Sequence, residues 1–145
     1  ESTPAVDRTT AVLSIRPVYA DRILAGTKTV EFRRKPLPEA VKTVLVWRTG
    51  KDGGVVGRFD VVRQLDGIVN DFLTQDFGGS MRTIRGSGIE ADALYAYAGH
   101  QGRLVGICIG DITPCTKISR FGWSAGPQNF RYAPADWRTV LEVAW

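Results

Sequence analysis

The sequence predicts an α+β fold: a small mixed β-barrel with short helices packed at its rim and ends. Segments with strand-like patterns outnumber helical ones and are interleaved with them along the chain. There is no internal repeat, and the regular strand–helix alternation of a doubly wound parallel sheet is missing. The 145 residues, 43% of them hydrophobic, suffice for one buried core and are too few for two ordinary domains.

The first ten residues carry little apolar surface. They are mostly polar, include Pro4 and show no hydrophobic period, so burial cannot offset the entropy lost on ordering. We therefore expect a disordered tail over residues 1–10 and a single domain over residues 11–145.

The domain opens with a strand and a helix. Residues 11–15 are apolar and strand-like. Pro17 suits a first helical position and Gly26 suits the position after the last turn, so a helix is expected over residues 18–25.

Residues 29–33 predict a half-buried strand because their polarity alternates. Val30 and Phe32 share one face, while the other face carries three polar groups in a row, from Thr29, Glu31 and Arg33.

The middle of the chain predicts a hairpin and a helix. Residues 44–47 and 55–62 are β-rich and are joined by a glycine-containing connection over residues 49–54. One apolar helical stripe follows, formed by Ile68, Val69, Phe72 and Leu73.

A basic loop, a third helix and another strand are expected next. Residues 78–88 contain four glycines together with Arg82 and Arg85, and they lead into a helix over residues 89–98. Residues 104–109 are strand-like, whereas residues 127–145 have no clear period.

Charge and composition narrow the function classes. The net charge of +4 and the pI near 9.3 suit a domain that meets polyanions and equally suit many ordinary proteins. Cys108 and Cys115 do not require a disulfide, so we expect a reducing, cytoplasmic setting. No apolar run approaches the ~20 residues that span a bilayer, so no membrane partner is expected. One histidine, His100, and two cysteines offer no zinc spacing, so neither a metal nor another cofactor is expected.

Two short motifs are rejected. Residues 122–126 match G-x-S-x-G, but His100 precedes Ser124, whereas a hydrolase elbow needs its histidine after the serine. A glycine-rich loop is the better interpretation. Residues 86–91 mimic a dinucleotide fingerprint, but no strand precedes them.

The first third of the domain resembles the opening of ASCH domains. The similarity rests on residues 13–17, on Tyr19 and on residues 23–33, which contain the pattern G-x-K-x-x-E-x-R. A weaker similarity returns at residues 127–132. The resemblance implies a PUA-like pseudo-barrel, a fold used for RNA contact, for modified-base recognition and, in some bacterial members, for hydrolysis.

Lys28, Glu31 and Arg33 are the leading site residues. They place a cation, an acceptor and a planar guanidinium within six residues, where they can converge on one polar ligand. A surface ion pair is the simpler interpretation of the spacing alone. The resemblance favours a site, because these positions coincide with the motif that lines the cleft in ASCH-like proteins.

Further candidates could hold a phosphate backbone or a base. Arg34 and Lys35 extend the cationic run, although a short charge run is more commonly a solvated loop. Four aromatic residues could stack on bases, or could simply belong to the core: Tyr19, Trp47, Trp123 and Tyr132.

The leading functional hypothesis is a module that binds RNA or a modified nucleotide, with Lys28 and Arg33 as donors and Glu31 as acceptor. The alternative is a metal-independent hydrolase in which Lys28 and Glu31 are catalytic, acting on RNA or on an acylated nucleoside. Some bacterial ASCH proteins resemble amidohydrolases that act on acylated cytidine, and these carry a threonine at the position of Glu31. The absence of that hydroxyl argues against hydrolysis of an acylated nucleoside. A third hypothesis is a protein-interaction module in transcription.

Overall fold

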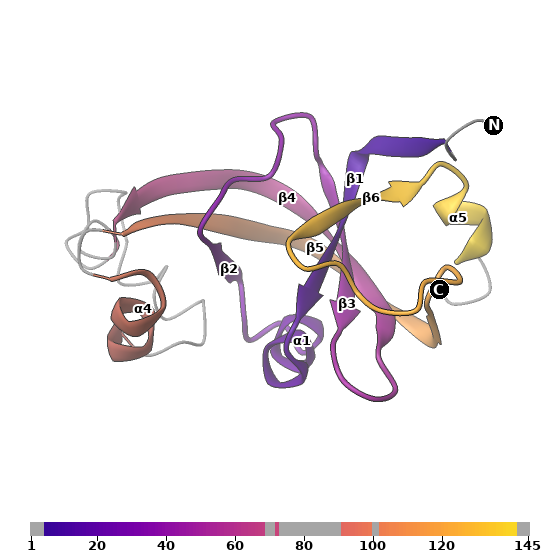
Figure 1. Ribbon diagram of the computed structural model, residues 1–145, viewed down its shortest axis with the longest axis horizontal. Coiled ribbons are helices and arrows are strands. Elements are labelled where there is room, and N and C mark those ends of the chain that lie inside the picture. Colours follow the sequence, from indigo (N-terminus) through magenta and orange to yellow (C-terminus); the bar gives the residue numbers. More distant parts are fainter. Residues whose placement is uncertain (1–4, 69–71, 73–90, 100–101, 142–145) are drawn as a thin grey trace.

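A computed structural model describes residues 5–68, 72, 91–99 and 102–141. Within them, six strands form one mixed sheet with short helices beside it (Figure 1). The sheet order is β2-β5-β4-β3-β1-β6. The strands are β1 (Val6–Ile15), β2 (Val30–Arg33), β3 (Thr43–Arg48), β4 (Gly54–Ile68), β5 (Arg103–Ser119) and β6 (Phe130–Pro134). The helices are α1 (Pro17–Leu24), α4 (Ala91–Ala98) and α5 (Trp137–Val140).

The predicted α+β class is confirmed, but the barrel is open. Within the described residues, β2 and β6 lie at opposite ends of the strand order, with no pairing between them. None of the helices in this part of the chain is long and apolar enough to cross a membrane.

The only parallel pair among the described strands is β1 with β3. Parallel neighbours need a crossover, and here the chain crosses through α1 and then β2. The helix predicted over residues 18–25 is confirmed as α1, which begins at Pro17 and ends at Leu24, with Ala25 as its C-cap before Gly26. Gly26 has a φ of 80°, a left-handed conformation that glycine adopts without steric cost.

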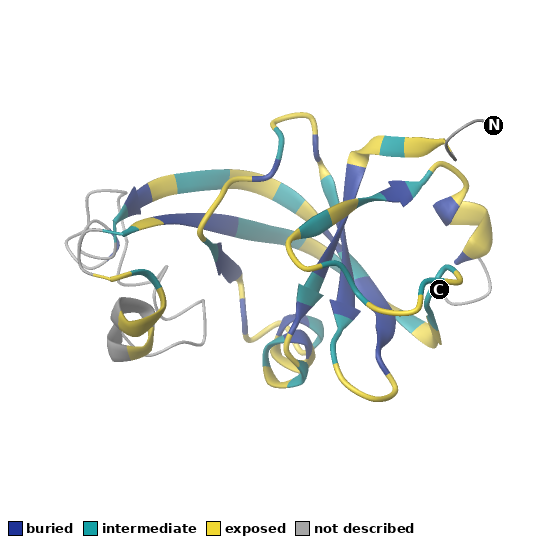
Figure 2. Cartoon of the chain, in the orientation of Figure 1, coloured by how far each residue is buried: buried dark blue, intermediate teal, exposed yellow. Residues whose placement is uncertain are grey.

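The central strands β1 and β3 are covered on both faces (Figure 2). Because successive side chains point to opposite faces, Leu13 and Val46 join one hydrophobic cluster, whereas Val12 and Leu45 join the other. The first cluster packs against α1, and the second contains Trp137 of α5. Burial on both faces explains why these strands read as continuous apolar runs in the sequence.

Strands β4 and β5 form a long curved ribbon (Figure 1). They contain 15 and 17 residues, and three register shifts interrupt their pairing. Such bulges bend the strands and increase their twist. The predicted segments 55–62 and 104–109 are the apolar parts of these longer strands, and the predicted hairpin is confirmed by the antiparallel pairing of β3 and β4.

Several expectations fall outside the described residues or need correction. The helix predicted from the stripe that begins at Ile68 is wrong at that residue, because Ile68 ends β4. Of the remaining stripe, only Phe72 is described; it is buried and packs edge-on against Phe32 with ring centroids 5.0 Å apart. The basic loop at residues 78–88 lies outside the described residues.

The prediction of a disordered tail over residues 1–10 is wrong for residues 6–10. Strand β1 begins at Val6, which pairs with Pro134 of β6. Asp7 accepts hydrogen bonds from the Thr9 amide and from the Thr9 and Thr10 hydroxyls at 2.9, 2.6 and 2.9 Å. Local polar contacts and a distant strand therefore supply the stabilisation that the composition lacks.

Candidate functional site

The turn after α1 delivers Lys28 into the interior. The amides of Thr27 and Lys28 both donate to the Arg22 carbonyl, at 3.0 and 3.1 Å, so the chain folds back under the helix. The Lys28 side chain is fully buried, and its Nζ donates to the Val30 carbonyl at 2.8 Å. Its ammonium also lies 5.2 Å from the ring centroid of Tyr19, within range of a cation–π contact.

One carboxylate joins the two cations of the motif. Glu31 Oε1 lies 3.3 Å from Lys28 Nζ, and Glu31 Oε2 lies 3.3 Å from Arg33 Nη1. Arg33 also donates from Nη1 to the Ser14 carbonyl and from Nη2 to the Asn129 carbonyl, both at 3.2 Å. The motif therefore forms one Lys28–Glu31–Arg33 network, anchored to β1 and to the segment before β6.

Burial within this network shifts the titration of Lys28. Removal from water disfavours the ammonium and lowers the pKa of Lys28 below its ordinary value, although the charge and hydrogen bond of Glu31 act in the opposite direction. A buried cation next to a buried carboxylate is stable only while both partners remain in place.

The network forms part of the wall of a cleft of about 460 Å³, which we call the polar cleft. Its wall includes Ser14 and Arg16, Tyr19 of α1, and the side chains of Glu31 and Arg33. Lys28 does not contribute to this wall and lies behind Glu31. Glu31 and Arg33 therefore line the cleft, while Lys28 holds the carboxylate from the interior.

Helix α4 supplies a further wall through Tyr97. Arg34 donates from Nη2 to the Tyr97 carbonyl at 2.5 Å, and its guanidinium carbon lies 4.8 Å from the Tyr97 ring centroid. Arg34 itself is not among the cleft-lining residues. Arg34 therefore holds Tyr97 of the cleft wall, and its predicted role in ligand binding stays a prediction.

The aromatic candidates divide between different parts of the molecule. Tyr19 lines the polar cleft, whereas Trp47 is buried in the second hydrophobic cluster and stacks on Trp123 at 5.8 Å between centroids. Tyr132 lines another pocket. Sequence reasoning missed Tyr97, which carries no signal of its own in the chain.

Ser14 and Arg16 were also missed as cleft residues, although both lie in the segment that carries the family resemblance. Ser14 Oγ donates to the Pro127 carbonyl at 2.6 Å, which holds the β5–β6 loop against β1. Gly126 in that loop approaches so closely that a Cβ there would lie 2.6 Å from Ser14 Oγ and from the Trp47 ring. The predicted glycine-rich loop at residues 122–126 is confirmed, and close packing explains Gly126.

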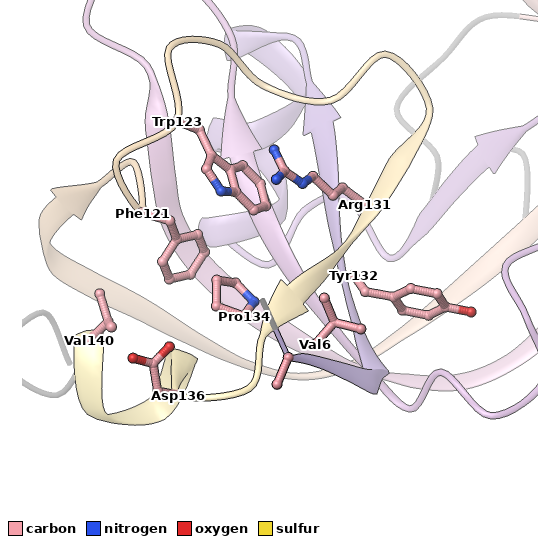
Figure 3. Close-up of a pocket in the computed structure, with 9 residues that line it drawn as sticks. Val6, Phe121, Trp123, Arg131, Tyr132, Pro134, Asp136 and Val140 are labelled. Carbon is pink, nitrogen blue, oxygen red and sulfur yellow. The ribbon is translucent and has the colours of Figure 1, made fainter. Parts of the chain in front are cut away.

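Beyond that loop lies a pocket of about 340 Å³, which we call the aromatic pocket (Figure 3). Phe121, Trp123 and Pro134 face its interior, and Arg131 and Asp136 lie at opposite ends of it. The Tyr132 ring forms part of the lining but points away from Pro134 and Phe121 (Figure 3).

Metal ligands are not gathered in the part of the chain that the structure describes. No group of three or more His, Cys, Asp and Glu side chains there could hold a metal ion. Cys108 and Cys115 are free, and burial raises the pKa of the Cys115 thiol to about 11. Cys115 is therefore a thiol, not a thiolate, at neutral pH.

Part of the chain is similar to a known protein family. The family model for the ASCH domain matches residues 13–76, which include the end of β1, the helix α1 and the whole Lys28–Glu31–Arg33 network. The resemblance to ASCH domains is therefore confirmed over this part of the chain. A curated relative, an ASCH domain-containing ribonuclease of Zymomonas mobilis, is 38% identical over 65 residues. That match covers 44% of this chain and 44% of the relative.

Solved structures extend the likeness to the rest of the ASCH domain fold. The crystal structure of ASCH from Zymomonas mobilis gives a TM-score of 0.78 at 23% identity, covering 96% of this chain and 98% of that one. A serine-to-alanine variant of the same protein gives 0.77 at 22% identity, over 97% and 100% of the two chains. At this identity the comparison shows the shared fold.

Proposed function

We propose that this ASCH domain binds single-stranded RNA in the polar cleft. The observation that carries the proposal is the Glu31–Arg33 pair, an acceptor and a guanidinium held together at the wall of a cleft that also contains two tyrosines. The Zymomonas mobilis relative, named as a ribonuclease, supports RNA as the ligand class.

Arg33 is suited to bind a phosphate. Its contacts with Glu31, Ser14 and Asn129 use three of its five N–H donors, so within the described residues Nε–H and one Nη2–H remain for a ligand. The side chain is 19% exposed, enough to meet a ligand while its direction stays fixed by three partners. Preorganised guanidinium groups form strong charge-assisted bonds to phosphate.

The rest of the polar cleft is suited to single-stranded nucleic acid. Tyr19 and Tyr97 lie on different helices and offer ring faces on which unpaired bases can stack, each worth roughly 1–3 kcal/mol. Glu31 can accept a hydrogen bond from an exocyclic amine or a ribose hydroxyl. Arg16 adds positive charge beside the cleft.

Cleavage of the bound strand is a second candidate function. Glu31 has the position of a general base, since it lies at the cleft wall, and Lys28 fixes it from behind. It could take the proton from an attacking 2′-hydroxyl or water, while Arg33 stabilises the charge that develops on the phosphate. Action on an acylated nucleoside is disfavoured, because the threonine of that reaction is replaced by Glu31.

Binding is tested with a labelled single-stranded RNA by fluorescence anisotropy at two salt concentrations. Wild type should bind at low salt and bind less tightly as salt rises. Arg33→Met should lose at least ~1.4 kcal/mol, about tenfold in Kd, because it removes a phosphate contact. Arg103→Met is the matched control, since Arg103 forms an exposed ion pair with Asp66 and does not belong to the network.

The same proteins separate binding from cleavage. Wild type and Glu31→Gln are incubated with the RNA in EDTA, and products are followed on a denaturing gel. Turnover by wild type that the substitution abolishes makes Glu31 the general base. Binding without turnover leaves Glu31 as a recognition group. An absence of RNA binding at low salt would remove RNA as the ligand.

A further inference from the structure

We propose that the aromatic pocket is a second nucleotide subsite, which takes a guanine base. This inference deepens the proposed function and rests on it, because the base is taken to belong to the RNA strand that occupies the polar cleft. The pocket is built from the start of β1, the β5–β6 loop, β6 and α5, so it uses a different part of the fold from the Lys28–Glu31–Arg33 network.

The segment that leads into β6 connects Arg33 of the polar cleft with the aromatic pocket. Arg33 of the cleft binds the Asn129 carbonyl, and Arg131 of the pocket is two residues further along the same segment. Two residues of strand correspond to roughly 7 Å. A strand of RNA held at Arg33 is therefore within reach of Arg131.

Arg131 is held in place by an aromatic ring. Its guanidinium carbon lies 4.0 Å from the Trp123 ring centroid, and Trp123 in turn stacks on the buried Trp47 with an interplanar angle of 18°. In the described part of the chain Arg131 forms no ion pair. The stacked rings of Trp123 and Trp47 thus fix the direction of the exposed Arg131 guanidinium, which can pair with the negative charge of a ligand.

Asp136 faces the same pocket from its other end (Figure 3). It precedes α5, yet its carboxylate makes no capping hydrogen bond, and it has no ion-pair partner among the described residues. The side chains of Phe121 and Pro134 lie between Asp136 and Arg131, and Val6 also lines the pocket (Figure 3). The pocket therefore offers a carboxylate acceptor and a cation, separated by a surface against which a flat ring can pack.

Phe121 supports the assignment independently. It has a φ of 54°, the only non-glycine residue with positive φ that the structure describes. Such a conformation is strained for a bulky side chain, and strain of this kind is common in ligand-contacting loops. Its ring packs at 5.4 Å from the Trp123 centroid and faces the pocket.

Guanine matches this arrangement better than the other bases. Its Watson–Crick edge presents two adjacent N–H donors, which a carboxylate can accept with both oxygens. Adenine and cytosine place an acceptor nitrogen beside their amino group, and uracil flanks its single N–H with two carbonyls, so each sets an acceptor against Asp136. Arg131 can pair with a phosphate of the same nucleotide.

The test titrates the full chain with GMP, AMP, CMP and UMP and follows amide NMR shifts. We expect GMP to bind about tenfold more tightly than the others, since one discriminating pair of hydrogen bonds is worth about that ratio. Asp136→Asn should remove the preference, whereas Asp52→Asn, a charge-matched change in an exposed turn, should retain it. Equal affinity for all four nucleotides, or a preference that survives in Asp136→Asn, would overturn the subsite.

A second experiment distinguishes failure of the guanine subsite from failure of the proposed RNA binding. It also distinguishes an RNA strand from a free nucleotide as the ligand of the pocket. Short RNAs with and without guanine are compared on wild type, Arg33→Met and Asp136→Asn. If Asp136→Asn loses the guanine preference but still binds RNA, the result supports a single RNA strand that occupies both the polar cleft and the aromatic pocket. RNA binding that never depends on guanine overturns the subsite alone. GMP selectivity without any RNA binding overturns the RNA function and leaves a site for a free guanine nucleotide.

Discussion

The polar cleft and the aromatic pocket hold their charged side chains in opposite ways. In the cleft, Glu31 is nearly buried and lies between Lys28 and Arg33, so the charges satisfy one another before any ligand arrives. In the pocket, Arg131 and Asp136 are exposed and are positioned by rings and by the α5 backbone. This fold therefore fixes a charged side chain in one of two ways: by an ion pair with an opposite charge, or by packing against an aromatic ring.

The two solutions have different energetic consequences. A buried pair is costly to break, because the remaining partner is left as an unpaired charge in a poor solvent. An exposed charge held by stacking can be removed with little loss of stability. Substitutions in the Lys28–Glu31–Arg33 network should therefore cost more stability than substitutions at exposed charges.

Lys28→Met should destabilise the protein by about 3–5 kcal/mol, because it leaves Glu31 nearly buried with only Arg33 as a partner. Urea unfolding followed by circular dichroism measures the loss. Adding Glu31→Gln should recover part of it, since the double variant buries no unpaired carboxylate. A loss below ~1 kcal/mol for Lys28→Met would mean that the pair behaves as a surface ion pair.

The stability difference between wild type and Lys28→Met should grow as the pH rises towards 10. The folded state lowers the pKa of Lys28, so between the folded pKa and the unfolded value of ~10.4 the unfolded chain binds more protons. Stability then increases with pH in that window, because the cost of burying the ammonium disappears. Urea midpoints of both proteins, taken from neutral pH to about pH 10, measure the trend; a constant difference would contradict the lowered pKa.

Asp7→Asn should cost about 1–3 kcal/mol and should loosen the aromatic pocket. Asp7 accepts a bond from Trp137 Nε1 at 2.9 Å, in addition to those from Thr9 and Thr10, and so ties α5 to β1. Thermal unfolding measures the loss, with the exposed Asp52→Asn as control. An equal effect of the two substitutions would show that the Asp7 bonds contribute nothing.

The contribution of Asp7 should also vanish in acid. Burial raises its pKa, but the hydrogen bonds from Thr9, Trp137 and Thr10 outweigh burial and hold the pKa well below its usual range. The folded pKa lies below the unfolded one, so the stabilisation is present above about pH 4 and is lost as the pH falls further. Wild type and Asp7→Asn should therefore converge in stability at the acid end of a pH series.

Arg103→Gln should change stability by less than ~1 kcal/mol. The Arg103–Asp66 pair is short, at 2.8 Å, but its side chains are 65% and 57% exposed, so water screens the attraction. Raising the salt concentration should abolish whatever effect remains. A loss as large as that of Lys28→Met would remove the distinction between exposed and buried charge in this molecule.

Local patterns in the sequence predicted what depends on near neighbours. The Pro17 and Gly26 signals predicted α1, and the apolar runs predicted the central strands, since each face of those strands meets its own hydrophobic cluster. The motif placed Glu31 and Arg33 on one face of β2, and the structure brings them together with Lys28.

Features that depend on distant partners were not predictable in this way. Residues 6–10 read as a tail because their partner strand, β6, comes from the other end of the chain. Tyr97 enters the cleft through Arg34, a contact that no spacing reveals. Trp47 and Tyr132 were candidates for stacking on a base because both are aromatic. The residue type alone does not show that Trp47 lies in the core and that Tyr132 lines the aromatic pocket.

The last strand also governs when the polar cleft comes into existence. Arg33 takes its direction from the Asn129 carbonyl, 96 positions later, and Ser14 is held by Pro127, 113 positions later. Contacts so distant in sequence form late in folding, after the loops between them have closed. During synthesis the motif leaves the ribosome before residues 127–129, whose carbonyls anchor it. The geometry of the Lys28–Glu31–Arg33 network is therefore complete only once that late segment has packed against β1 and β2.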